Sequence, residues 1–262
     1  MKMRMILAAI LICLSLKLAQ AEVLKNISIE TRSGVFVSAL LITPSSPKAA
    51  LIMMPGGPGV IDLSGTTIGR TRGFLSANFE NFAAKNLTVV IVDAPSDEAG
   101  GLSPRFRQTA AHLKDLKAVI ARIKHETNLP VWLIGISRGA ISVLHAAVNS
   151  NESINGFIAL SSPTRIPPRS GVIRLTDLEL DRVKIPALLG SHRDDGCRGT
   201  PPDGAEQIAR GLINSPNAAA KIFSGGRNIG RNPCGPGSPH TFEGIHDEVV
   251  EYIAKFIHKN TR

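Results

Sequence analysis

The chain has 262 residues, of which 43% are hydrophobic, 19% charged and 4% aromatic. This composition excludes an intrinsically disordered or collagen-like chain, and the length is that of a single α/β domain with a large core. The formal charge is +9, from 30 Lys and Arg against 21 Asp and Glu, but the basic residues are scattered along the sequence. A basic arm that binds nucleic acid is therefore not expected.

The N-terminus has the pattern of a secretory signal peptide. Two basic residues precede an apolar stretch at 6–16, and Ala-Gln-Ala at 19–21 provides the small residues that signal peptidase accepts. We expect a signal peptide over 1–21, cleavage before Glu22, and a mature protein that is periplasmic or secreted. The apolar stretch is too short to span a bilayer and no later segment is long enough, so no stable membrane span is expected.

The mature chain, residues 22–262, alternates short apolar runs with amphipathic stretches. This alternation is typical of a single α/β domain with a mostly parallel sheet of about eight strands and helices on both faces. In chain order, the first half predicts strands at 26–31, 35–43 and 49–54, a helix at 74–85, a strand at 87–92 and a helix at 106–125. The second half predicts a strand at 131–136, a helix at 140–148, strands at 154–160 and 185–190, a helix at 203–213, a strand at 219–223 and a closing helix at 244–257.

The strongest chemical signal is Gly135-Ile136-Ser137-Arg138-Gly139, between a buried strand and an apolar helix. This is the context of a nucleophile elbow, a tight strand-to-helix turn whose serine has a strained backbone. Bulky side chains two residues before or after the serine would obstruct the turn, which explains the glycines. Ser137 is therefore the predicted nucleophile, at the N-terminus of a helix whose amide groups favour developing negative charge.

A serine hydroxyl needs a base to activate it, and the base needs a carboxylate to orient it. In a sheet with such an elbow, the acid follows a later strand and the histidine lies near the C-terminus. Asp194 and Asp195 follow the strand at 185–190, and His240 precedes the closing helix. Asp195, which enters a turn containing Gly196, is the preferred acid, and Asp194 is the alternative.

The remaining histidines are less suited to be the base. Those within predicted helices are His112, His125 and His145, and His258 lies at the C-terminal tail. His192 lies too close to the two aspartates, and His246 is expected on the surface of the closing helix.

Removal of the signal peptide leaves two cysteines, Cys197 and Cys234. An even number of cysteines in an exported chain predicts one disulfide. The bridge would join the segment that carries the acid to the segment that carries His240. It would then limit the motion of two residues that must stay within about 3 Å of each other. It would also stabilise the fold by about 4 kcal/mol.

An oxyanion hole needs backbone N–H donors. One is expected from Arg138, directly after the nucleophile, and the other from the loop after the strand at 49–54. That loop reads Pro-Gly-Gly-Pro-Gly at 55–59, and Gly57 is the preferred donor. The alternative, a phosphate-binding loop, is disfavoured because the segment lacks the lysine and spacing of a Walker motif and does not fit the dinucleotide fingerprint.

These motifs resemble those of the α/β-hydrolase superfamily over about residues 26–257. The segment 135–139 is similar to the family's elbow, and 55–59 is similar to its His-Gly-Gly-Pro-Gly loop, with Pro55 in place of the histidine. More narrowly, the chain resembles a group of exported, uncharacterised bacterial hydrolases with two cysteines. The resemblance implies serine esterase-type chemistry. Only 161–184 lies where some members have a large cap domain, so none is expected.

The sequence therefore predicts an exported serine hydrolase that cleaves a carboxylic ester or related acyl bond through an acyl-enzyme intermediate. The expected partner is a small acyl substrate, with no metal, cofactor or nucleic acid. A peptidase or thioesterase with the same triad, and a non-catalytic binding protein on the same fold, are the alternatives. Arg70, Arg72, Arg107 and Arg138 either select an acidic substrate or are ordinary surface residues.

Overall fold

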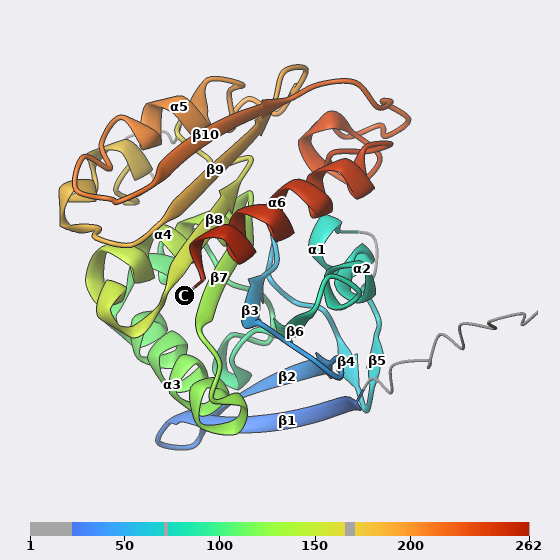
Figure 1. The fold of residues 1–262 in the computed structure, drawn as a ribbon, viewed down its shortest axis with the longest axis vertical. Helices are drawn as coiled ribbons and strands as arrows, with labels where there is room; N and C mark the ends of the chain where they lie inside the picture. Colours follow the sequence, from blue (N-terminus) through green and yellow to red (C-terminus); the bar gives the residue numbers. More distant parts are fainter. Residues whose placement is uncertain (1–22, 71–72, 166–170, 262) are drawn as a thin grey trace, which may run out of the picture.

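The structure is a computed structural model that describes residues 23–70, 73–165 and 171–261. A sheet of eight strands runs through the molecule, with helices on both of its faces (Figure 1). In spatial order its strands are β1 Val23–Arg32, β2 Val35–Thr43, β6 Leu87–Val92, β3 Ala49–Met54, β7 Val131–Ile136, β8 Gly156–Leu160, β9 Ala187–His192 and β10 Ala218–Phe223. The predicted fold class is confirmed. The predicted signal peptide lies outside the described residues.

Most of this sheet is parallel. β1 and β2 form an antiparallel hairpin, and β2 pairs antiparallel with β6. All the other neighbours, from β6 through β3, β7, β8 and β9 to β10, are parallel. Every residue of β3, β6, β7, β8 and β9 is buried, because helices cover both faces of the sheet. The carboxyl ends of these parallel strands therefore lie along one edge of the sheet, where binding sites of open α/β sheets form.

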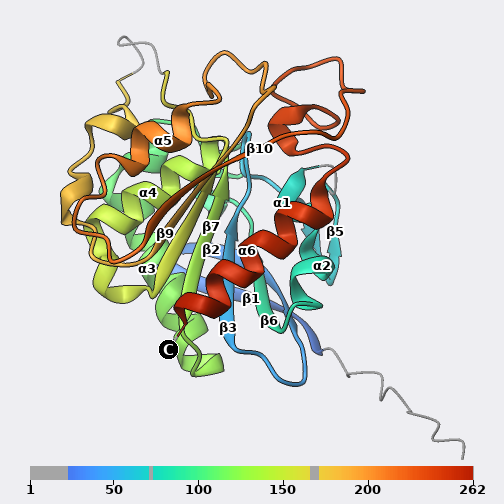
Figure 2. The ribbon, with the colours of Figure 1, turned by 45° about the horizontal axis from the view of Figure 1, so that its top comes forward.

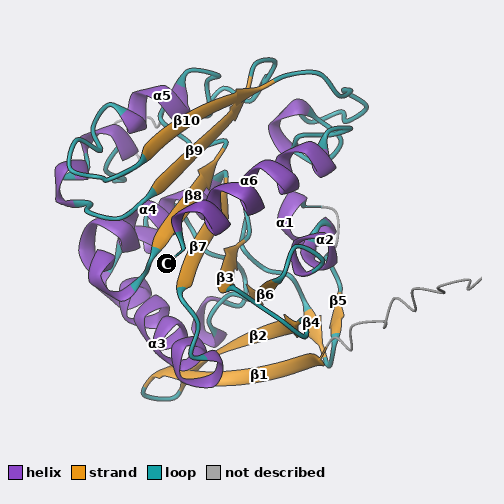
Figure 3. Cartoon of the chain, viewed as in Figure 1, coloured by secondary structure: helices purple, strands orange, loops and turns teal. Residues whose placement is uncertain are grey.

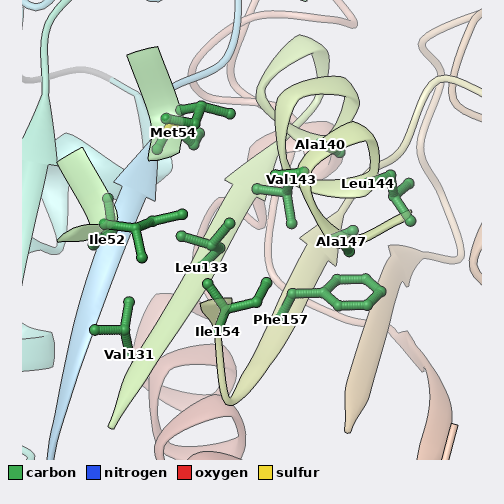
Figure 4. Packing of buried hydrophobic residues seen from close by; sticks show 14 of the residues in the cluster. Ile52, Met54, Val131, Leu133, Ala140, Val143, Leu144, Ala147, Ile154 and Phe157 are labelled. Carbon is green, nitrogen blue, oxygen red and sulfur yellow. The ribbon is translucent and has the colours of Figure 1, made fainter. Parts of the chain in front are cut away.

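The helices divide between the two faces of the sheet (Figures 2 and 3). They are α1 Phe74–Ala77, α2 Phe79–Ala83, α3 Ala110–Thr127, α4 Arg138–Ser150, α5 Gly204–Ala209 and α6 His246–Asn260. Because successive strand residues point to opposite faces, Ile52 and Met54 of β3 join the hydrophobic cluster under α3, α4 and α5 (Figure 4). Leu51 and Met53 of the same strand join the cluster under α1, α2 and α6.

Several features differ from the predicted elements. The helix predicted at 203–213 ends at Ala209, four residues early. The segment 74–85 forms two short helices, α1 and α2, because the backbone at Asn78 (φ −113°) leaves the helical region. The helix predicted from residue 106 begins at Ala110, where the Thr109 hydroxyl caps it after a short 3-10 helix. A small hairpin, β4 Leu63–Ser64 with β5 Thr67–Ile68, was not predicted, because strands of two residues carry no periodicity.

The segment between β8 and β9 is short. Its described residues, 161–165 and 171–186, contain only two 3-10 helices, Leu175–Asp177 and Leu180–Arg182, so the described part has no cap domain at this position. Nor does the described part of the chain contain a helix long and apolar enough to cross a membrane.

Candidate active site

Ser137 lies in the turn between β7 and α4, with φ 54° and ψ −125°. Non-glycine residues rarely adopt this conformation, which persists only where the surrounding structure imposes it. A Cβ atom on Gly135 would lie 2.4 Å from the Gly139 carbonyl oxygen. One on Gly139 would lie 2.0 Å from the Met54 carbonyl oxygen. The turn therefore packs too closely for any residue but glycine at positions 135 and 139.

Asp195 and His240 form a buried pair. The Nδ1 atom of His240 lies 2.9 Å from Oδ2 of Asp195, and the two side chains are 1% and 0% exposed. A proton on Nδ1 that is donated to the carboxylate leaves Nε2 with a free lone pair. This Nε2 atom is buried and has no hydrogen-bond partner among the described residues. Asp194, the alternative acid, is exposed.

Further hydrogen bonds hold the Asp195 carboxylate. The Cys197 N–H donates to Oδ1 at 2.9 Å, and the Thr200 hydroxyl donates to Oδ2 at 2.9 Å. The same hydroxyl oxygen lies 3.1 Å from Nδ1 of His240. Thr200 is buried and contacts both members of the pair, yet it was not among the predicted site residues. No sequence motif includes Thr200, and its position five residues after Asp195 is the one feature that could have pointed to it.

The segments that carry Asp195 and His240 are joined in two places. Cys197 and Cys234 form a disulfide, which confirms the predicted bridge. His192, buried at the end of β9, accepts from the Asp194 N–H on Nδ1 and donates to the Gly225 carbonyl oxygen from Nε2. His192 therefore shapes this part of the site through backbone contacts, and it connects the end of β9 to the segment after β10.

The His240 segment also contacts the rest of the protein. The Ser161 hydroxyl, just after β8, donates to the His240 carbonyl oxygen at 2.9 Å. His246 binds the Thr241 carbonyl oxygen through Nε2 at 3.0 Å, and its Nδ1 lies 3.2 Å from the Asn78 side-chain amide. His246 is thus partly buried, and the prediction of a surface position for it is wrong. These contacts fix the backbone on both sides of the His240 imidazole.

Ser137 and His240 line one cavity of about 490 Å³. Most of its other lining groups are apolar or backbone, including Val60, Ile61 and Phe74. Gly56 and Gly57 also line it, so the loop after β3 faces the same space as the serine. The described residues hold no group of three His, Cys, Asp or Glu side chains that could bind a metal ion. The cavity has the size and lining of a small-molecule site.

The loop at 55–59 passes close to the elbow. A Cβ atom on Gly56 would lie 3.0 Å from the Ile136 carbonyl oxygen. Gly57 has φ +58°, and the Gly59 N–H donates to the Gly56 carbonyl oxygen at 3.1 Å. Because the C=O and N–H of a trans peptide point in opposite directions, this bond directs the Gly57 N–H away from Gly59. The Arg138 N–H, by contrast, is placed by its position at the start of α4.

The four arginines singled out in the sequence occupy different environments. Arg70 lines the cavity and forms an exposed ion pair with Asp62 at 2.6 Å. Arg138 is exposed, and Arg72 lies outside the described residues. Arg107 is only 1% exposed, so it is neither an ordinary surface residue nor free to bind a substrate. Burial, and secondarily the charge of Arg138, lowers the pKa of Arg107 to about 9.

Comparisons with known proteins give matches only at the level of structure. No protein-family model matches the sequence, and no curated protein matches it. A dienelactone hydrolase from Anabaena variabilis matches with a TM-score of 0.64 and 15% identity, over 92% of this chain and 99% of that chain. The fold is that of the α/β-hydrolases.

Two further solved structures share this α/β-hydrolase fold. The Pyrococcus furiosus esterase Pf2001 matches with a TM-score of 0.66 and 16% identity, over 92% of each chain. Est1E from Butyrivibrio proteoclasticus matches with a TM-score of 0.63 and 14% identity, over 90% of this chain and 98% of that chain. The shared fold extends over nearly the whole length of these proteins.

Proposed function

We propose that this protein is an exported serine hydrolase that cleaves a carboxylic ester or a related acyl bond through an acyl-enzyme intermediate. Ser137 is the nucleophile, His240 the base and Asp195 the residue that orients the base. One observation carries the proposal: a serine in a strained elbow lines the same cavity as the histidine of a buried Asp–His pair, whose Nε2 atom has no partner among the described residues.

The first half of the reaction forms the acyl-enzyme. His240 Nε2 removes the hydroxyl proton while Ser137 Oγ attacks the substrate carbonyl carbon, and the carbonyl oxygen becomes an oxyanion. The N–H groups of Gly57 and Arg138 donate to this oxyanion. The C–O bond to the leaving group then breaks, and the imidazolium of His240 gives its proton to the departing oxygen.

The second half releases the acid. Water attacks the acyl carbon while His240 Nε2 removes a proton from it, and the second tetrahedral intermediate uses the same N–H donors. The bond to Ser137 Oγ breaks, and Oγ recovers a proton from His240. Throughout both halves, the Asp195 carboxylate holds the imidazole in place and stabilises the positive charge that forms on it.

The cavity and the structural neighbours support a small ester as substrate. The cavity is about 490 Å³ and mostly apolar, and the described residues between β8 and β9 form no cap over it. The neighbours include proteins described as an esterase and a dienelactone hydrolase. Export rests on the predicted signal peptide, and a mature N-terminus at Glu22 in the mass spectrum of exported protein is the expected result.

A fluorophosphonate probe tests the function directly. We expect the probe to label Ser137, and short-chain p-nitrophenyl esters to be hydrolysed by the wild type. The Ser137→Ala variant should be neither labelled nor active. The Ser76→Ala variant is a matched control that should keep both properties, because Ser76 lines the same cavity and its hydroxyl donates to the Gly73 carbonyl oxygen. A folded wild type that neither reacts with the probe nor hydrolyses any ester would instead be a binding protein on this fold.

A further inference from the structure

Arg107 is a buried arginine that the mechanism above does not use. It lies in a 3-10 helix, Phe106–Gln108, ahead of α3, and its guanidinium reaches the loop at 55–59. Nη2 lies 3.4 Å from the carbonyl oxygens of both Pro55 and Gly57. It also packs so closely that a Cβ atom on Gly59 would lie 2.5 Å from it. The guanidinium thus lies directly behind the loop that lines the cavity.

This arginine is not explained by a salt bridge. The described residues give Arg107 no ion pair, although two carboxylates line a small cavity beside it. Asp115 binds Thr31 and Arg32, and Asp93 accepts from backbone N–H groups. Burying a charge without a carboxylate partner is costly, so a purely structural role would be better served by an apolar side chain.

The other end of the guanidinium is anchored. Nη1 donates to the Ser142 hydroxyl of α4 at 2.9 Å, and that hydroxyl lies 2.9 Å from Nε2 of His112. Burial, and then the charge of Arg107, lowers the pKa of His112 to about 3, so this histidine is neutral and adds no competing charge. Arg107 therefore joins α4, which begins at the elbow, to the loop after β3.

The two carbonyls that Arg107 binds stand on either side of the Gly56–Gly57 peptide. The Pro55 carbonyl shares its peptide with the Gly56 N–H, and the two point in opposite directions. Gly57 has a positive φ with open space around its α-carbon, so sterics alone do not hold this peptide. The Gly59 N–H holds the Gly56 carbonyl of this peptide. The bonds from Arg107 to the Pro55 and Gly57 carbonyls hold the two flanking peptides, so that all three peptides of the loop keep their orientation.

We propose that Arg107 is a positioning residue for the oxyanion hole: it holds the Pro55 and Gly57 carbonyls on either side of the Gly56–Gly57 peptide, so that the Gly57 N–H faces the reacting oxygen. The inference rests on the proposed hydrolase function. It goes beyond that function by assigning the order of a glycine-rich loop to a side chain some fifty positions away.

The test compares Arg107→Met with the wild type, using kcat, KM and the inhibition constant of a trifluoromethyl ketone. The ketone forms an oxyanion with the serine and so reports on the oxyanion hole. Arg107→Met keeps the volume but removes the donors. We expect kcat to fall about 100-fold, because a misplaced oxyanion donor costs nearly as much as a deleted one. KM should change little, and the ketone should lose affinity in proportion to kcat/KM.

Three other variants complete the test. Arg107→Lys keeps one donor and should recover part of kcat. Ser142→Ala removes the anchor of Arg107, together with the contact to His112, and should lower kcat about threefold. Arg105→Met, at an exposed position two residues earlier, should match the wild type. Should Arg107→Met fail to fold, Arg107→Lys and Ser142→Ala decide the outcome.

Three results would overturn the inference while the hydrolase assignment stands. The first is an active wild type whose folded Arg107→Met variant retains kcat within about threefold. The second is a loss of kcat in Arg107→Met with unchanged affinity for the ketone. The third is unchanged kcat in both Arg107→Lys and Ser142→Ala. An inactive, unlabelled wild type would remove the proposed function and this inference together.

Discussion

Two halves of the candidate site are held in place by different physical means. The nucleophile half, residues 55–59 and 135–139, lies at the carboxyl ends of two adjacent central strands. Close backbone contacts fix the elbow, and Arg107 binds two carbonyls of the loop at 55–59. The base half, residues 193–200 and 224–241, follows β9 and β10 on longer connections that a disulfide and side-chain hydrogen bonds hold together. A tight strand-to-helix turn needs no cross-link, whereas residues on long loops need one to keep a fixed distance.

The largest effect is expected from breaking the buried pair in the base half. Asp195→Asn keeps the shape but replaces the acceptor of the His240 proton, so the imidazole loses both its tautomer and its stabilising charge. We expect kcat to fall about 10⁴-fold, with the thermal unfolding temperature little changed. Asp194→Asn, at an exposed neighbouring position, is the matched control and should stay within about twofold of the wild type.

Steady-state kinetics with p-nitrophenyl esters measures this difference between the two aspartates. The opposite result, in which Asp194→Asn is the inactive variant, would contradict the placement of the acid. Nearly equal activity of both variants would mean that the buried pair has a structural role only.

Most of the nucleophile half could be predicted from the sequence. The chemistry of an elbow requires glycine at fixed spacing around a serine, and β3, β6 and β7 are unbroken apolar runs, so local pattern and observed structure agree there. The order of later strands also indicated which segments would carry the acid and the histidine. The choice between Asp194 and Asp195 stayed open because the loop conformation, not the composition, determines which side chain turns inward.

The contacts of Thr200 and Arg107 could not be predicted from sequence patterns, because both residues contact parts of the chain that are far away in sequence. Thr200 contacts His240, and Arg107 contacts the loop at 55–59. Arginine is usually exposed, so its type gave no sign that Arg107 is buried. The break at Asn78 was missed for a related reason, because the apolar spacing of 74–85 fits one helix as well as two.

Removing the disulfide should affect only the base half. Cys197→Ser breaks the bridge, and we expect kcat to fall roughly tenfold, because the Asp195 and His240 segments gain relative motion. The free energy of unfolding should fall by about 2–4 kcal/mol. Hydrogen exchange should quicken for the amides of 224–239, while those of 135–139 keep their protection.

Cys234→Ser provides the control for this experiment. It removes the same bridge from the other end and leaves the residue whose N–H binds Asp195 unchanged. The two variants should therefore behave alike. Unchanged kinetics in both would show that the bridge stabilises the fold without ordering the site, and faster exchange at the elbow would show that the two halves are not independent.

The smallest effect is expected at Thr200, because its loss leaves the disulfide and the Asp195–His240 bond in place. Thr200→Val removes the hydroxyl that donates to Oδ2 of Asp195 but keeps the branched shape. One hydrogen bond of about 1 kcal/mol corresponds to a fall in kcat of about fivefold. Thr200→Ser keeps the hydroxyl and should restore most of kcat, which a packing role would not explain, since serine loses the methyl group. A fully active Thr200→Val together with an impaired Thr200→Ser would mean that the methyl group of Thr200, and not its hydroxyl, supports activity. The hydrogen bond from Thr200 to Asp195 would then not be needed to hold the Asp195–His240 pair.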